Sequence, residues 1–232
     1  MKKIIRKAIV DTIPVMTGYL CLGFGFGILH QSAGYSILTA FITSLTMFSG
    51  SMQYIGVGLL ASGAPYPTVA LTTLLVQARH IFYGISMLEK YKDVGLRKYY
   101  LLFGLTDETY SLLCNDHSDI PLDRRNDYYL AVTMLNHSYW VTGCVLGATV
   151  GTLVNFNSEG IDFVLTALFV TIFLEQWHST KKHTSALIGI GASVVCLLIF
   201  GSENFLIPTM AVIAASLCII PDESVNVKRR RR

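Results

Sequence analysis

Charged residues are scarce in this sequence of 232 residues: Asp, Glu, Lys and Arg make up 14% of it, against about 25% in a soluble domain. None of them occurs between residues 12 and 78. A bilayer crossing needs roughly 20 apolar residues, so this stretch alone accommodates two or three crossings. A soluble element has to show one face to water, which excludes a soluble globular domain here. The 52% content of hydrophobic residues also excludes a disordered chain.

Other features are missing as well. A net charge of +3 is too small for a nucleic-acid-binding surface. The five cysteines are odd in number and have no metal-binding spacing, so we interpret them as small buried hydrophobic residues. Neither Gly-x-Ser-x-Gly, His-Glu-x-x-His nor a P-loop occurs. These absences predict a protein that is not an enzyme and has no cofactor and no metal.

Apolar segments separated by polar loops indicate an all-α, polytopic integral membrane protein with six to eight transmembrane helices, some of them broken or re-entrant. The expected segments are 12–29, 37–60, 68–88, 99–114, 128–155, 161–177, 184–201 and 205–220. They form a single transmembrane domain over 12–221. The tails 1–11 and 222–232 are both basic and are expected on the cytoplasmic side of the inner (cytoplasmic) membrane.

The positions of Lys and Arg leave two topologies open. Eight plain crossings put every basic loop inside except 90–98, which carries four positive residues. Alternatively, 37–64 enters and leaves on the outer side and 99–114 enters and leaves on the inner side. Six full crossings then remain, and every basic loop is cytoplasmic. Interrupted segments of this kind are typical of a transporter's binding site.

Three polar clusters lie inside apolar segments. The first is a polar break that includes Ser49, Gly50, Ser51 and Gln53. Unwound backbone at membrane depth is tolerated only where it is buried in protein or lines a cavity, and a half-helix N-terminus attracts a carboxylate. The break is therefore a candidate substrate site, although the same residues would also suit a polar contact between helices.

The second cluster is Arg79-His80, in the middle of a segment. An intramembrane Arg costs at least ~2.5–3.5 kcal/mol, so it has to be paired or face a cavity. We expect Arg79 and His80 to contribute to the substrate site. The alternatives for Arg79 are a structural ion pair with Asp107 or Glu108, and extension of its side chain to the inner surface.

The third cluster is Thr106-Asp107-Glu108. Buried carboxylates can carry protons, so Asp107 and Glu108 are candidate coupling residues. The compatible structural interpretation is a helix cap, with Thr106 or Asp107 opening a half-helix. His137 could belong to a proton relay, but a satisfied core histidine is the stronger interpretation.

Gly143, Gly147 and Gly151 recur at four-residue spacing, a pattern that favours close helix packing. Together with the polar clusters, several ordered stretches form a characteristic series. These are Gly23–Gly27, Phe48–Tyr54, Ala61–Pro65, Arg79–Gly84, Leu105–Glu108, Trp140–Gly151, Asp162-Phe163 and Ala167–Phe169. In this order and spacing they resemble the large subunit of AzlC-type branched-chain amino acid permeases.

The resemblance implies a multi-pass transporter that exports branched-chain amino acids such as valine, leucine and isoleucine. It also implies a small hydrophobic AzlD-type membrane subunit as partner, and secondary transport driven by an ion gradient. Gln77 stands where relatives often carry Asn two residues before the Arg-His pair. Other interpretations are a non-transporting accessory or assembly subunit, an exporter of another small amphipathic solute, and an intramembrane enzyme.

Overall fold

The computed structural model describes residues 2–114, 120–153 and 183–219, together with positions 170, 173, 174 and 177. Every regular element in these ranges is a helix, as predicted. The helices are α1 (Lys2–Ser32), α2 (Ile37–Thr46), α3 (Gly50–Ala61), α4 (Tyr66–Met87), α5 (Arg97–Phe103), α6 (Asp107–Leu113), the 3-10 turn η1 (Leu122–Arg124), α7 (Arg125–Leu153), α9 (Thr184–Asn204) and α10 (Leu206–Ile219). The chain divides into two compact units, residues 1–168 and 169–232.

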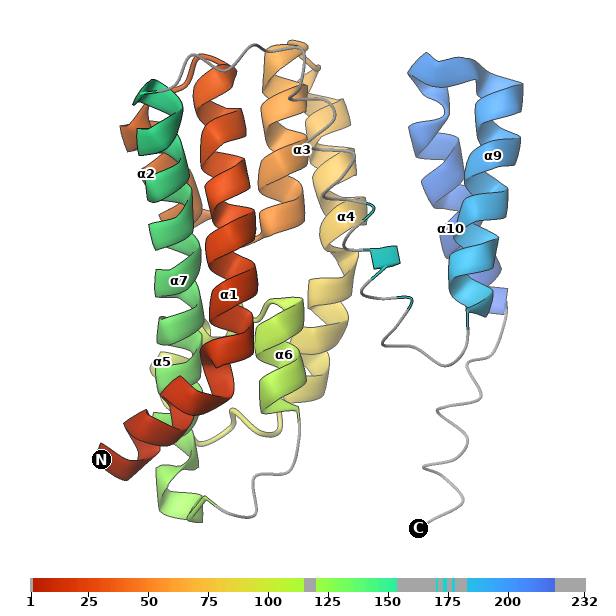
Figure 1. The fold of residues 1–232 in the computed structure, drawn as a ribbon. Coiled ribbons are helices and arrows are strands. Elements are labelled where there is room, and N and C mark those ends of the chain that lie inside the picture. The colour runs from red at the N-terminus through yellow and green to blue at the C-terminus, as the bar shows by residue number, and fades with distance from the viewer. Residues whose placement is uncertain are drawn as a thin grey trace. The chain divides into compact units, whose positions relative to one another are not determined.

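Two long helices, α1 and α7, form the scaffold of the first unit (Figure 1). Their contact is made through glycines. A Cβ atom at Gly23 would lie 2.9 Å from the carbonyl oxygen of Trp140, and one at Gly143 would lie 2.9 Å from a carbonyl oxygen of α1. At Gly27 and Gly147 a Cβ atom would overlap the backbone of the facing helix. The predicted close packing of the glycine face is therefore confirmed, and its partner is the glycine-rich part of α1.

The segment between α1 and α4 is a half-length hairpin made of α2 and α3. It starts beside the end of α1, where His30 Nε2 lies 3.0 Å from Thr39 Oγ1. It turns back at Phe48, whose ring stacks on His137 of α7 with centroids 4.6 Å apart. It then returns along α1, because Tyr54 packs edge-on against Phe26. The hairpin thus stays at one end of the scaffold (Figure 1).

The segment between α4 and α7 is a second half-length hairpin, made of α5 and α6, at the opposite end of the scaffold (Figure 1). Its α5 reaches the level of His137, halfway along α7, where Tyr100 Oη lies 3.0 Å from His137 Nδ1. Phe48 of the first hairpin contacts the same histidine, and we call this level the middle level. Its α6 then runs back beside α4, with Tyr110 stacked on Tyr83. Lys90 Nζ donates to the carbonyl oxygen of Cys114 at 2.7 Å, a cation at the end of a helix.

Each hairpin has its own hydrophobic core. The core beside α2 and α3 includes the buried rings of Tyr19, Phe26, Phe48, Tyr54 and Trp140. The core beside α5 and α6 is built from other residues, namely Ala8, Met87, Tyr91, Val94, Leu101, Leu105, Leu113, Ile120, Tyr128, Tyr129 and Val132. Burial of these side chains fixes the two hairpins on a common scaffold and brings their turning points together at mid-length.

The predicted interruptions of 37–60 and 99–114 are both present, and each segment returns to the end from which it came. The position of the first break differs from the prediction, as described below. Helix α1 begins at Lys2, so residues of the predicted N-terminal tail continue the first segment as helix. The predicted segment 161–177 and the basic tail 222–232 lie almost wholly outside the described residues.

Among the described residues, one helix, Lys3–Ser32, is both long enough and apolar enough to cross a bilayer. Two shorter helices, Ile37–Thr46 and Ala186–Gly201, are also apolar. Helices α4 and α7 have 22 and 29 residues, but they carry the polar side chains of the middle level. In the second unit α9 packs against α10.

Candidate functional site

The break of the first hairpin begins two residues earlier than its polar sequence suggested. Helix α2 ends at Thr46, and α3 begins at Gly50, with Ser49 as the N-cap in an extended conformation. The prediction that the break includes Ser49, Gly50, Ser51 and Gln53 is therefore right for Ser49 alone. Gly50, Ser51 and Gln53 already belong to the first turn of α3. Gly50 permits this start because a Cβ atom there would lie 2.8 Å from the ring of Trp140.

Ser49 does not cap the helix that it precedes. Ser and Thr at an N-cap ordinarily accept a hydrogen bond from a backbone N–H of the first turn. The hydroxyl of Ser49 instead donates to Gln77 Oε1 of α4 at 2.9 Å, and α3 has no side-chain cap. The N–H groups in the first turn of α3, at the positive end of its dipole, therefore lie at the middle level and have no side-chain cap.

The break of the second hairpin covers Gly104, Leu105 and Thr106. Thr106 Oγ1 accepts a hydrogen bond from the Thr109 N–H at 3.3 Å, which confirms the expected helix cap. Asp107 and Glu108 occupy the first turn of α6, where negative charge is favourable. Gly104 is required because a Cβ atom there would overlap the methyl group of Thr133 on α7.

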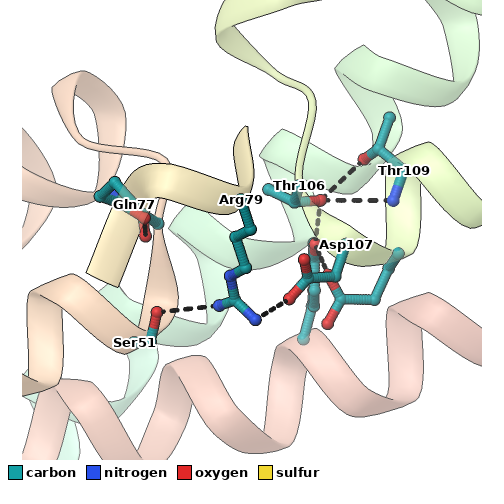
Figure 2. Close-up of polar contacts among 9 residues, drawn as sticks. Ser51, Gln77, Arg79, Thr106, Asp107 and Thr109 are labelled. Atoms are coloured by element: carbon teal, nitrogen blue, oxygen red, sulfur yellow. Dashed lines mark hydrogen bonds and ion pairs between the residues drawn. The ribbon is translucent and has the colours of Figure 1, made fainter. Parts of the chain in front are cut away.

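Arg79 connects the two hairpins (Figure 2). It lies near the middle of α4, with its Nη1 2.6 Å from Asp107 Oδ2 and its Nη2 donating to Ser51 Oγ at 3.2 Å. The ion pair with Asp107 is one of the alternatives that the sequence left open for Arg79. The two side chains still expose 37% and 34% of their surface, so the pair is not sealed inside the first unit. A charged group at this level can therefore meet a ligand as well as its partner.

Glu108 has a different environment from its neighbour. Its Oε2 accepts a hydrogen bond from the Tyr19 hydroxyl at 2.6 Å, and the same hydroxyl lies 2.6 Å from Thr106 Oγ1. Asn136 Nδ2 of α7 donates to Thr109 Oγ1 at 3.0 Å. The start of α6 is thus held by α1 on one side and by α7 on the other.

Gln53 is buried behind the first break, where its Oε1 accepts a hydrogen bond from Trp140 Nε1 at 2.7 Å. His137 is also buried, between Phe48 and Tyr100, which places it in the core as expected. Of its two ring nitrogens, Nδ1 meets the Tyr100 hydroxyl, whereas Nε2 has no hydrogen-bond partner among the described residues, so the histidine is only partly satisfied. His80 stands apart from these groups. Its ring packs edge-on against Tyr83, and among the described residues it has no hydrogen bond to another predicted site residue.

The structure brings three of the predicted site residues, Ser51, Arg79 and Asp107, into contact. Sequence reasoning missed Tyr19 and Trp140 as polar members of the same level. Both are aromatic residues in glycine-rich apolar segments, where a lone ring is usually part of the core. The signal that could have found them is their polar tip, since a buried Tyr O–H or Trp N–H needs a hydrogen-bond partner.

Comparisons with known proteins identify the family of the chain. The model of the AzlC protein family matches residues 14–154, which contain both hairpins and the Arg79 centre. No solved structure matches the chain.

The chain is 46% identical to the "Branched-chain amino acid transport protein AzlC" of Bacillus subtilis (strain 168), over 93% of this chain and 84% of that protein. It is 41% identical to a membrane protein of Haemophilus influenzae, over 86% of this chain and 82% of that protein. It is 36% identical to a membrane protein of Helicobacter pylori (strain ATCC 700392 / 26695), over 94% and 95% of the two chains. The family model and these relatives show that the chain is a membrane protein of the AzlC family.

Proposed function

We propose that this protein is the large subunit of a carrier that exports branched-chain amino acids such as valine, leucine and isoleucine. The observation that carries the proposal is the position of Arg79, which joins two half-length hairpins at their breaks. Broken helices that meet at mid-depth form the binding sites of many secondary transporters. The name of the Bacillus subtilis relative, a branched-chain amino acid transport protein, supports this class of substrate.

The substrate's carboxylate would bind at the uncapped start of α3, close to Ser49, Gly50 and Ser51, with Arg79 as its cationic partner. A helix N-terminus offers N–H donors and a positive dipole end to an anion. Gln53 would support this turn from behind, and His80 would line the approach along α4. The rings of Phe48 and Phe103 lie at the two breaks with centroids 6.5 Å apart and offer an apolar wall to the aliphatic side chain.

The chain would span the cytoplasmic membrane six times, with both termini in the cytoplasm. The crossings would be α1, α4, α7, the segment 161–177, α9 and α10. The hairpin α2–α3 would then enter from outside and the hairpin α5–α6 from inside. This arrangement keeps the basic loop 90–98 in the cytoplasm, in agreement with the positive-inside rule.

Transport would proceed by alternating access around the middle level. Movement of one hairpin against the scaffold would open the site to one side, and movement of the other would open it to the opposite side. One of the two acids, Asp107 or Glu108, would take part in proton coupling. A small hydrophobic AzlD-type subunit is the expected partner in the membrane.

An efflux measurement tests this function. Cells that lack endogenous exporters would be loaded with leucine- or valine-containing dipeptides, and the free amino acid outside would be followed over minutes. Expression of the chain with its candidate partner is expected to increase the rate of efflux. The chain alone would show whether the partner is required. An unchanged rate with both subunits verified in the membrane would contradict the proposal.

A further inference from the structure

Adjacent acids on α6 have partners of different chemical character. Asp107 is neutralised by the guanidinium of Arg79 at 2.6 Å. Glu108 forms no ion pair within the described residues, and its hydrogen-bond partner is the neutral hydroxyl of Tyr19. A carboxylate that is already balanced by a fixed cation has little to gain from a proton. A carboxylate held by a hydroxyl can accept a proton and keep the same hydrogen bond with donor and acceptor exchanged.

Tyr19 links this carboxylate to the cap of the helix that carries it. Its hydroxyl lies 2.6 Å from both Glu108 Oε2 and Thr106 Oγ1, but it has a single hydrogen to donate. When Glu108 is ionised, Tyr19 donates to the carboxylate. When Glu108 is protonated, the acid can donate to Tyr19, and the Tyr19 hydrogen is then free to point at Thr106 Oγ1.

Resting on the transport function proposed above, we propose that Glu108, and not Asp107, binds the coupling proton, and that Tyr19 is the positioning residue that transmits its protonation from α6 to α1. The proton is taken from water on the outer side as Glu108 becomes a carboxylic acid. It is returned to water on the inner side as the carboxylate forms again. No covalent bond other than the O–H bond changes in this cycle.

The surroundings of Glu108 support this assignment. The charged and titratable groups that act on it are Tyr19 from α1, Arg79 from α4 and Asp107 on its own helix. Since Arg79 is bound to Asp107, the two form a pair with no net charge beside Glu108. From α7 the neighbouring polar group is the neutral amide of Asn136, which donates to Thr109. Glu108 is thus the acid whose charge changes without breaking an ion pair.

The test uses the purified chain, with its partner subunit where efflux requires it, in liposomes. Two rates are measured with radiolabelled leucine: exchange at equal pH on both sides, and accumulation driven by an imposed pH gradient. The diagnostic quantity is the ratio of accumulation to exchange. Glu108→Gln is expected to lower this ratio at least 10-fold while exchange stays measurable. Asp107→Asn is expected to lower both rates together, because it releases Arg79.

A second variant tests the proposal even if Glu108→Gln does not fold. Tyr19→Phe removes one oxygen atom and keeps the acid. It is expected to shift the pH midpoint of exchange by about one unit, the effect of one hydrogen bond to a charged group. Glu89→Gln changes an exposed acid after the end of α4 and should leave the ratio and the midpoint at wild-type values.

Two outcomes would overturn the inference. One is gradient-driven accumulation by Glu108→Gln in the wild-type ratio, and the other is an unshifted pH midpoint in Tyr19→Phe. These differ from a failure of the proposed function, which would show as an absence of leucine exchange in the wild-type protein. That result would remove the transport function and the assignment of Glu108 with it.

Discussion

The hairpins α2–α3 and α5–α6 are both interrupted at mid-length, but the helices that follow the two breaks start differently. Each turns at mid-length and resumes after a hydroxyl-bearing N-cap, Ser49 in the first and Thr106 in the second. Thr106 caps its own helix, whereas Ser49 donates its hydrogen bond to Gln77 on a neighbouring helix. A hydroxyl-bearing residue at the N-cap therefore leaves the start of α3 uncapped but caps the start of α6.

The first turns of α3 and α6 also differ in charge. The first turn of α3 contains no ionisable residue, while the first turn of α6 contains Asp107 and Glu108. A helix start without its own acid is available to an external anion, whereas a start with two acids is already neutralised. Arg79 contacts both starts, so a change at one is felt directly at the other. The comparison suggests a division of labour, with substrate at the first break and coupling at the second.

Arg79→Ala is expected to have the largest effect, because it removes the link between the two helix starts. The variant leaves Asp107 unpaired and removes the donor to Ser51. Loss of one partner costs ~3–5 kcal/mol in a fully buried pair, and about 2 kcal/mol is reasonable for a pair that keeps a third of its surface exposed. Transport is expected to fall at least about 30-fold with membrane insertion intact, measured as leucine efflux per unit of protein in the membrane.

Arg97→Ala is the matched control for that variant. Arg97 also pairs with an aspartate, Asp127, at 3.3 Å, but its side chain is 58% exposed. An exposed pair of this kind contributes about 0–1 kcal/mol, so efflux should stay within about two-fold of wild type. Normal export by Arg79→Ala would show that Arg79 has no part in the site.

Gly50→Ala is expected to have the next largest effect, because it acts on the first hairpin alone. The added Cβ would lie 2.8 Å from the Trp140 ring and would displace either that ring or the start of α3. Overpacking of this kind costs ~1–3 kcal/mol, which predicts a roughly 10-fold loss of leucine efflux. Gly56→Ala is the control on the same helix, where the Cβ meets nothing within 4 Å. Equal efflux by the two variants would contradict the role assigned to this helix start.

Capping can be compared through thermal unfolding of the purified protein in detergent. Thr106→Ala removes the acceptor of the Thr109 N–H and is expected to destabilise the protein by about 1 kcal/mol. Ser49→Ala removes no cap and should cost about half of that or less, the value of one neutral hydrogen bond to Gln77. A larger loss in Ser49→Ala than in Thr106→Ala would reverse the proposed difference between the two breaks.

The smallest expected effect comes from Gln77→Asn, which makes the first hairpin more like the second. The amide is shorter by one methylene group, so it loses its reach to Ser49, and the freed hydroxyl can cap α3. The apparent KM for leucine is expected to rise about three-fold, in line with roughly 0.7 kcal/mol lost at the carboxylate site. A lowered KM would show that the Ser49–Gln77 bond does not keep the α3 start open.

Much of the secondary structure could be predicted from the sequence, because apolar runs and their polar interruptions are local features. Two broken segments, the cap at Thr106 and the close packing of Gly143 and Gly147 were all expected. The exact start of α3 was not, since it depends on the Trp140 ring, which limits the space beside Gly50. A residue 90 positions away in the chain decides that helix boundary.

The sequence by itself determined that this is a helical membrane protein with charged residues inside its apolar segments. Such residues have to be paired or face a cavity, because an isolated charge at membrane depth is costly. Only the tertiary structure decided how they are paired. Asp107 and Glu108 are adjacent in the chain and equivalent in the sequence, yet the helical turn of 100° between them points one at Arg79 of α4 and the other at Tyr19 of α1. Their separate roles follow from that difference in direction, which depends on where α1 and α4 pack against α6.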